Sequence, residues 1–231
     1  MKKVLLLAAS ACLFAVSANA QVRFGPEVGI TSNSFNYDID DIDESSNTGW
    51  RVGAAVDICL ASHLTLQPGL YWSRKGGERD FIRSTAVVTP FNNNVVIVNG
   101  AEVEEKVDLS YLEIPLLLNY YFDAGPGRIF VGAGPTLSIG INGDYGRKIH
   151  TPGNGVVAED EFDIDFGNDG HIKGTDFGIM ANLGYDFDFG LFVRPFANWG
   201  LSDLSNNDNF TIHNRTWGIG LGYWFGNHHN K

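Results

Sequence analysis

Large apolar residues alternate with small residues along the C-terminal stretch, residues 215–225. A period of two places successive side chains on opposite faces of a β-strand, whereas a helix would scatter the same residues around its axis. We therefore predict a strand with one apolar face that carries aromatic residues at both ends. A strand of a transmembrane barrel takes about 9–11 residues, and aromatic girdles mark its two water interfaces. The apolar positions are Trp217, Ile219, Leu221, Tyr223 and Phe225.

The same alternation recurs along the chain after residue 21. Seven further segments each have one uninterrupted apolar face, so eight strands are expected in all. The predicted strands span residues 22–32, 48–60, 63–74, 109–122, 127–140, 173–187, 191–201 and 215–225.

The connections between these segments differ in length. Three are tight, at residues 60–63, 123–127 and 188–190, and the others are longer and polar, at residues 33–47, 75–108, 141–172 and 202–211. Short periplasmic turns and long extracellular loops are typical of outer-membrane barrels. We therefore predict an all-β fold, an eight-stranded antiparallel up-and-down transmembrane β-barrel. Its even strand number places both termini on the periplasmic side.

Charged residues fall almost entirely on the face opposite the apolar one. This arrangement favours lipid outside and a polar lumen inside. Because eight strands leave room only for side chains, we expect these charges to pair and fill the lumen, with Glu113 bound to Arg51 or Arg194 in a structural role. The predicted lumen network is Arg23, Glu27, Arg51, Asp57, Glu113, Arg128, Asp176, Asp186 and Arg194.

Five prolines conflict with the strand pattern, because each lies inside a predicted strand. Proline has no N–H to donate to a neighbouring strand, and lipid cannot replace the missing hydrogen bond. We expect β-bulges in the periplasmic half of the barrel to accommodate them. The prolines are Pro26, Pro68, Pro115, Pro135 and Pro195.

The N-terminus has the pattern of a secretory signal peptide. A short basic head, Met1–Lys3, precedes an apolar run, residues 4–16, and a small-residue end at Ser17–Ala20. This predicts a cleaved signal peptide at residues 1–20, a barrel at residues 21–226 and a short polar tail at residues 227–231. A lipoprotein cleavage site at Cys12 is the alternative, which is disfavoured because the apolar run continues beyond it.

Composition narrows the class of protein further. After residue 21 no run of about 18 apolar residues occurs, so a membrane location would require a closed barrel. The formal net charge of −11 argues against nucleic acid as a partner. Cys59 is the one cysteine after the predicted cleavage site, which leaves no partner for an internal disulfide.

Three motifs resemble a known family. They are residues 111–118 (YLEIPLLL), residues 132–135 (GAGP) and residues 218–225 (GIGLGYWF). Together they resemble the small outer-membrane β-barrel proteins of Bacteroidetes, often called porin-family or PorT-like proteins. The resemblance implies the outer membrane of a Gram-negative bacterium, with outer-membrane lipid and the barrel assembly machinery as partners. It also implies an assembly signal at Phe225, although residues 226–231 follow that aromatic here.

Two acidic runs lie on predicted outer loops. Carboxylate oxygens suit calcium or magnesium, and the first run lacks the glycine and the distant glutamate of an EF-hand loop. We interpret both runs as solvated loops that make the outer surface anionic and open to bridging by divalent cations, and we predict no cofactor. Residues 159–165 form the second run, and the weak metal candidates in the first are Asp38, Asp40, Asp41, Asp43 and Glu44.

Histidines offer a weak case for catalysis. Asp176 with His171 or His213 would form an acid–base pair near the rim, but no nucleophile motif accompanies it. We therefore predict no enzyme activity. The leading hypothesis is a monomeric barrel with a filled lumen and a structural or surface-interaction role. The alternatives are a narrow porin-like channel for small solutes, an envelope enzyme with a rim-located Asp/His site, and a soluble lipocalin-like periplasmic barrel.

Overall fold

A computed structural model describes residues 22–37, 45–88, 95–151, 155–167, 172–205 and 211–226. The predicted signal peptide, the acidic run at residues 38–44, His171 and the tail at residues 227–231 lie outside the described residues. Within the described part, no helix has both the length and the apolar character needed to cross a membrane.

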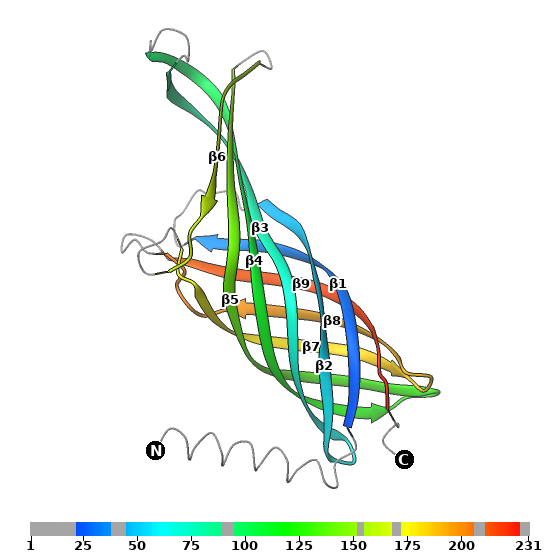
Figure 1. Ribbon diagram of the computed structural model, residues 1–231. Coiled ribbons are helices and arrows are strands. Elements are labelled where there is room, and N and C mark those ends of the chain that lie inside the picture. The colour runs from blue at the N-terminus through cyan, green and yellow to red at the C-terminus, as the bar shows by residue number, and fades with distance from the viewer. Residues whose placement is uncertain are drawn as a thin grey trace, which may run out of the picture.

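The described chain forms nine antiparallel strands (Figure 1). Each of the eight predicted segments coincides with one of them, and the additional strand is β6. The strands are β1 (Val22–Tyr37), β2 (Ser45–Ala61), β3 (Leu64–Val88), β4 (Val95–Asp123), β5 (Gly127–Thr151), β6 (Gly155–Ile164), β7 (Thr175–Phe187), β8 (Leu191–Gly200) and β9 (Ile212–Tyr223).

Eight of the nine strands close into a ring. The sheet order is β4-β3-β2-β1-β9-β8-β7-β5-β6, and an additional pairing of β4 with β5 joins the two ends. Strand β6 stays outside this closure, because it pairs with β5 beyond the point where β7 ends. The pairing of β5 with β7 stops at Ile139, and the pairing with β6 starts at Gly143. The ring therefore has the predicted number of strands.

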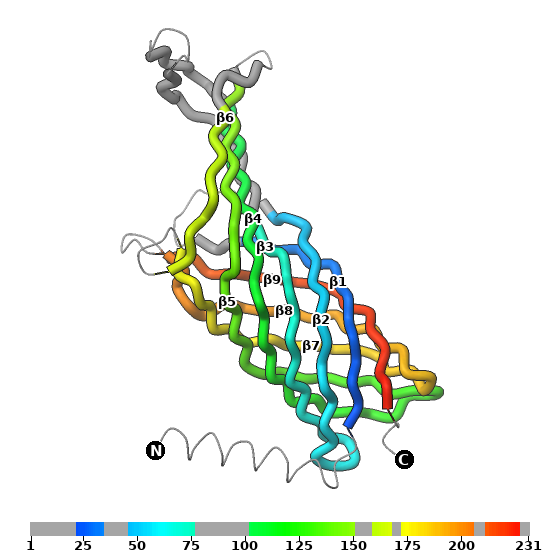
Figure 2. Tube along the Cα trace, in the orientation of Figure 1, coloured from blue at the N-terminus to red at the C-terminus, as the bar shows by residue number. Residues whose placement is uncertain are grey.

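Two of the predicted loops are wrong. Strands β3 and β4 continue through much of residues 75–108, and residues 141–172 contain the end of β5 and all of β6. These extensions rise well beyond the ring (Figures 1 and 2). Polar strands are stable in water when opposite charges face each other across the ladder, as Lys148 and Glu159 do. We call residues 102–109 of β4, 143–151 of β5 and 155–164 of β6 the projecting sheet.

The opposite end of the ring is compact. Tight turns join β2 to β3, β4 to β5 and β7 to β8, as predicted. Gly125 (φ 62°) and Gly190 (φ 100°) supply the left-handed backbone that two of these turns require. The first and last described strands end here as well, where Phe24 and Phe225 exchange backbone hydrogen bonds of 2.9 and 2.7 Å.

The five prolines lie at gaps in the ladder, each between a different pair of strands. At Pro68, for example, paired residues stop at Ala55–Gly69 and resume at Ile58–Leu66. The register is unchanged across each gap, so no extra residue is inserted and the expectation of bulges is wrong. Because proline lacks an N–H, two residue pairs are missing from the ladder at each gap. The gaps lie between β1 and β9 at Pro26, β2 and β3 at Pro68, β3 and β4 at Pro115, β4 and β5 at Pro135, and β7 and β8 at Pro195.

The outer face of the ring is apolar, as the alternation predicts. Ile30 is 64% exposed and Phe177 is 60% exposed. Aromatic side chains gather in two belts on this face, which is the pattern at the two water interfaces of a membrane barrel. The belt at the compact end contains the ring pairs Tyr120–Phe122, Tyr185–Phe187 and Tyr223–Phe225, and the belt toward the projecting sheet contains Trp50–Trp72 and Trp199–Trp217.

Candidate functional site

The lumen of the ring holds a balanced set of buried charges. Ten charged side chains are buried in the described part, five basic and five acidic. Nine of them are the predicted lumen residues, and the tenth is Lys75, which the sequence analysis assigned to a loop. The net charge of −11 therefore resides elsewhere in the chain. The set is Arg23, Glu27, Arg51, Asp57, Lys75, Glu113, Arg128, Asp176, Asp186 and Arg194.

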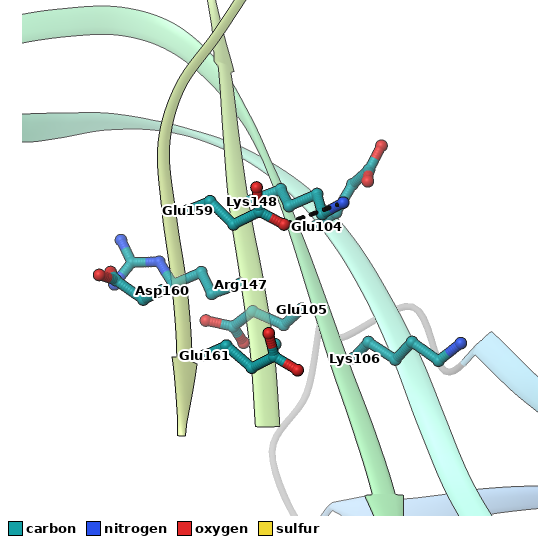
Figure 3. A pocket seen from close by; sticks show the side chains of 9 residues that line it. Glu104, Glu105, Lys106, Arg147, Lys148, Glu159, Asp160 and Glu161 are labelled. Atoms are coloured by element: carbon teal, nitrogen blue, oxygen red, sulfur yellow. Dashed lines mark ion pairs between the residues drawn. The ribbon is translucent and has the colours of Figure 1, made fainter. Parts of the chain in front are cut away.

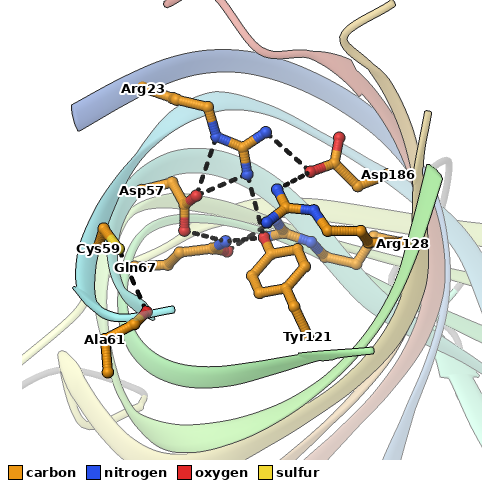
Figure 4. A network of polar contacts seen from close by, with 9 residues as sticks. Arg23, Asp57, Cys59, Ala61, Gln67, Tyr121, Arg128 and Asp186 are labelled. Atoms are coloured by element: carbon orange, nitrogen blue, oxygen red, sulfur yellow. Dashed lines mark hydrogen bonds and ion pairs between the residues drawn. The ribbon is translucent and has the colours of Figure 1, made fainter. Parts of the chain in front are cut away.

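Four of these charges form a cluster toward the compact end (Figure 4). The Arg23 guanidinium lies 2.6 Å from Asp57 Oδ2 and 2.8 Å from Asp186 Oδ2. Arg128 lies 3.1 Å from the same oxygen of Asp186. Positive and negative groups thus alternate across β2, β1, β7 and β5. The Arg23–Asp186 pair links β1 to β7, which is three strands away around the ring.

Gln67 connects this cluster to the next one along the barrel axis. Its Nε2 donates to Asp57 Oδ1 at 2.7 Å and to the Tyr121 hydroxyl at 3.0 Å. Its Oε1 accepts a hydrogen bond from Arg194 at 2.9 Å. One neutral side chain therefore joins two ionic groups without adding charge.

Glu27 is the centre of the second cluster. Its carboxylate accepts from Arg51 at 2.9 Å and from the Tyr71 hydroxyl at 2.9 Å, and Arg194 lies 3.3 Å away. The Arg51 guanidinium also stacks on aromatic rings, 3.9 Å from the Tyr71 centroid and 4.0 Å from the Phe196 centroid. Planar guanidinium groups suit this combination of carboxylate and ring contacts in a buried site.

Glu113 has a different partner from the one predicted. It pairs with Lys75 at 2.5 Å, while Arg51 and Arg194 both bind Glu27. The sequence analysis missed Lys75 because it ended the predicted strand at residue 74, whereas β3 continues and turns Lys75 inward. The period of two along β3 was the signal that could have found it.

Large side chains fill the rest of the lumen. Tyr71, Tyr121, Phe130 and Phe192 are at most 1% exposed, and the arginines lie among them. Toward the projecting sheet, Leu109, Tyr111 and Ile164 form an apolar cluster over the lumen. Residues on several strands and loops pack against that cluster, namely Val107, Tyr145, Phe166, Ile172 and Ile212. Ionic and apolar groups thus occupy the lumen along its length.

Of the two predicted acid–base pairs at the rim, Asp176 with His213 does not form, and Asp176 with His171 stays a prediction because His171 lies outside the described residues. Asp176 is buried and accepts from Asn214 Nδ2 at 3.1 Å. His213 Nδ1 lies 3.1 Å from the Ser202 carbonyl oxygen, so each of the two side chains has a partner other than the other one. Among the described residues, no group of three or more histidine, cysteine or acidic side chains is placed to hold a metal ion. The candidates Asp38–Glu44 lie outside those residues.

Phe225 follows directly after β9. Its ring is 56% exposed and contacts Tyr223, and its backbone pairs with Phe24 across the closing strands. It therefore lies on the apolar outer face at the compact end. Its predicted role as an assembly signal stays a prediction.

The projecting sheet is the second candidate site, and its charge is exposed. Neighbouring rows across β4, β5 and β6 are Glu104–Lys148–Glu159, Glu105–Arg147–Asp160 and Lys106–Gly146–Glu161. Lys148 Nζ lies 3.1 Å from Glu159 Oε1. These rows line a cavity of about 600 Å³ with five carboxylates and three cationic groups (Figure 3). A Cβ at Gly146 would meet nothing within 4 Å, so the cavity is open at this residue.

Comparison with solved structures finds similar proteins at low sequence identity. Solved structures with a similar strand arrangement include OprG from Pseudomonas aeruginosa, with 13% identity, 90% of this chain and 97% of that chain covered, and a TM-score of 0.44. Neisserial surface protein A has 10% sequence identity to this chain. The match covers 87% of this chain and 97% of that chain, with a TM-score of 0.42. Ail of Yersinia pestis, in complex with the heparin analogue sucrose octasulfate, has 12% sequence identity to this chain. The match covers 89% of this chain and 99% of that chain, with a TM-score of 0.40.

A search of curated proteins gave no match to the chain. A family model described as "outer membrane protein beta-barrel domain" matches residues 14–206, which is most of the sequence. The chain therefore belongs to this family of β-barrels, which reside in the outer membrane of Gram-negative bacteria.

Proposed function

We propose that this protein is a sealed outer-membrane barrel whose role is to hold the projecting sheet at the cell surface. The observation that carries the proposal is the charge-balanced lumen. Its ion pairs include those of Arg23, Glu27 and Lys75, and together they involve most strands of the ring. A continuous aqueous path needs space between side chains, and the interior of an eight-stranded ring is only wide enough for the side chains themselves.

The orientation and route are part of the same proposal. The signal peptide at residues 1–20 directs export, the barrel assembly machinery inserts the chain, and Phe225 is the recognised aromatic. The compact end lies in the periplasm and the projecting sheet lies outside, where the excess negative charge can attract divalent cations. We propose a monomer with no catalytic activity, from a bacterium of the Bacteroidetes, as the resemblance to porin-family proteins implies.

Reconstitution into planar lipid bilayers tests the sealed lumen. We expect no conductance steps from wild-type protein, with insertion verified by the mobility difference between unheated and boiled samples on a gel. Steady conductance steps from the folded, unheated protein would contradict the sealed barrel and favour the alternative, a narrow channel for small solutes.

Cysteine labelling of intact cells tests the orientation. Gly146→Cys, in a Cys59→Ser background, places a thiol in the open cavity, and we expect it to react with a maleimide that cannot cross membranes. Ser62→Cys is the matched control, because it is exposed in a tight turn at the compact end. We expect it to react only after the cells are opened. Labelling of Ser62→Cys but not of Gly146→Cys in intact cells would mean that the orientation is opposite to the one proposed.

A further inference from the structure

Strand β6 leaves one of its backbone edges open. Within the part of the chain that the structure describes, β6 pairs with β5 on one side and stands last in the sheet order. Figure 1 shows it at the margin of the projecting sheet, beside β5. A free edge presents a row of N–H and C=O groups that another strand can pair with. β6 has 10 residues, which is longer than the roughly 5–6 residues of a typical strand.

The side chains on β6 differ in whether β5 compensates their charge. Glu159 faces Lys148 and Asp160 faces Arg147, so each meets a cation across the ladder. Glu161 instead faces Gly146, and Asp163 faces Asp144. Cross-strand neighbours of opposite charge stabilise a sheet, and like charges destabilise it. Glu161 and Asp163 therefore have no cation directly opposite them on β5, and a cation on the open side of β6 would compensate their charge.

The two faces of β6 would contact different kinds of side chain on an added strand. Side chains alternate, so Glu159, Glu161 and Asp163 share one face, and Asp160, Phe162 and Ile164 share the other. Phe162 is 45% exposed and stacks on Tyr145 at 4.7 Å. An added strand would therefore need cations on one face and an apolar residue beside the exposed ring on the other.

The cavity supplies room for such cations. It lies along β6 from Glu159 to Glu161 and is open over Gly146, where no side chain projects. A lysine or arginine opposite Glu161 can extend into it and meet carboxylates from two strands. A second copy of β6 would instead bring acidic residues against acidic residues, which disfavours self-association at this edge.

We propose that β6 accepts an extended cationic segment of a partner protein as an added strand. Lysine or arginine at every second position of the segment lies opposite Glu159, Glu161 and Asp163, and an apolar residue lies opposite Phe162. Main-chain hydrogen bonds supply affinity and the alternate side chains supply specificity, as in other cases of strand addition. This inference rests on the proposed function, because the projecting sheet must face the outside to meet a partner.

A synthetic nine-residue peptide with alternating lysine and valine tests the proposal on the full chain in detergent. We expect saturable binding by calorimetry, and none for the matched peptide with alternating glutamate and valine. The double variant Glu161→Gln/Asp163→Asn should weaken binding about fivefold to tenfold, because two cross-strand charge pairs are lost. Asp188→Asn, an exposed aspartate at the compact end, is the control and should change nothing.

Backbone methylation separates strand addition from simple charge attraction. In an added strand only alternate N–H groups face β6. One peptide carries N-methyl groups at the odd positions and another at the even positions, and we expect one of them to bind and the other to fail. Equal binding by both, or no binding by the unmethylated peptide, would overturn the inference. Bilayer recording and surface labelling do not depend on this result, so the proposed function would stand or fall separately.

Discussion

The lumen and the projecting sheet are both rich in ion pairs, but the pairs differ in solvent exposure. Glu27 and Arg51 are at most 1% exposed in the lumen, whereas the side chains of Lys148 and Glu159 in the projecting sheet are 51% and 58% exposed. The N–O distances are nearly the same, 2.9 and 3.1 Å. Water screens the exposed pair, which therefore contributes little to stability and leaves its charges available to a partner. Burial, rather than distance, separates a structural ion pair from an interaction surface.

Removing Glu27 should give the largest loss of stability. Glu27→Ala leaves Arg51 and Arg194 buried without their shared carboxylate, and unpaired buried charges cost about 3–5 kcal/mol. We expect a loss of that order in the free energy of unfolding, measured by urea titration with the gel mobility of the folded form as readout. A loss below about 1 kcal/mol would mean that solvent reaches the lumen arginines.

Removing Glu113 should have a smaller effect because one cation loses its partner, rather than two. Glu113→Ala removes the ion-pair partner of Lys75, and the folded form should lose its mobility at a lower temperature on heating. The double variant Lys75→Met/Glu113→Leu is the matched control, since an apolar pair of similar volume removes both charges. We expect it to recover most of the heat resistance. If both variants behave alike, the cost arises from packing and not from charge.

Asp203 lies between β8 and β9 and gives an intermediate, pH-dependent case. Partial desolvation acts to raise its pKa, but hydrogen bonds from the Ile212 and Ser205 amides and from Lys173 outweigh this and lower the pKa below its ordinary value of 3.8. A carboxylate with a lowered pKa stabilises the folded state above its unfolded pKa, and this contribution is lost as the pH falls through the folded pKa. We expect protection of the Ser205 and Ile212 amides from hydrogen exchange to be constant above pH 3.8 and to decrease below it. Asp203→Asn should remove this dependence.

The projecting sheet should tolerate the loss of an ion pair. Lys148→Ala removes the partner of Glu159, and exposed pairs contribute about 0–1 kcal/mol. We expect the free energy of unfolding to stay within that range of the wild-type value at both low and high salt. A loss comparable to that of Glu27→Ala would mean that ion pairs in the two regions contribute equally to stability.

Local patterns predicted the strands and the buried charged residues, but not the partners of those residues. The period of two gave the inward positions of Arg51 and Glu113, because alternation is a property of each strand alone. Whether Glu113 reaches Arg51 or Lys75 depends on how the strands are staggered around the ring, which no single strand reveals. β6 was missed for a different reason. Outside a membrane a strand needs no apolar face, so its acidic residues resembled a solvated loop.

The proline gaps have a consequence for the chain before it inserts. A barrel strand with a complete row of donors and an apolar face is a template for pairing with other copies while it is still in water, and proline interrupts such rows. We infer that Pro68, Pro135 and the other strand prolines protect the unfolded chain from aggregation, although two residue pairs are lost at each proline gap in the finished barrel. Replacing Pro68 and Pro135 by valine should increase light scattering on dilution from urea. Unchanged scattering would leave the prolines without this role.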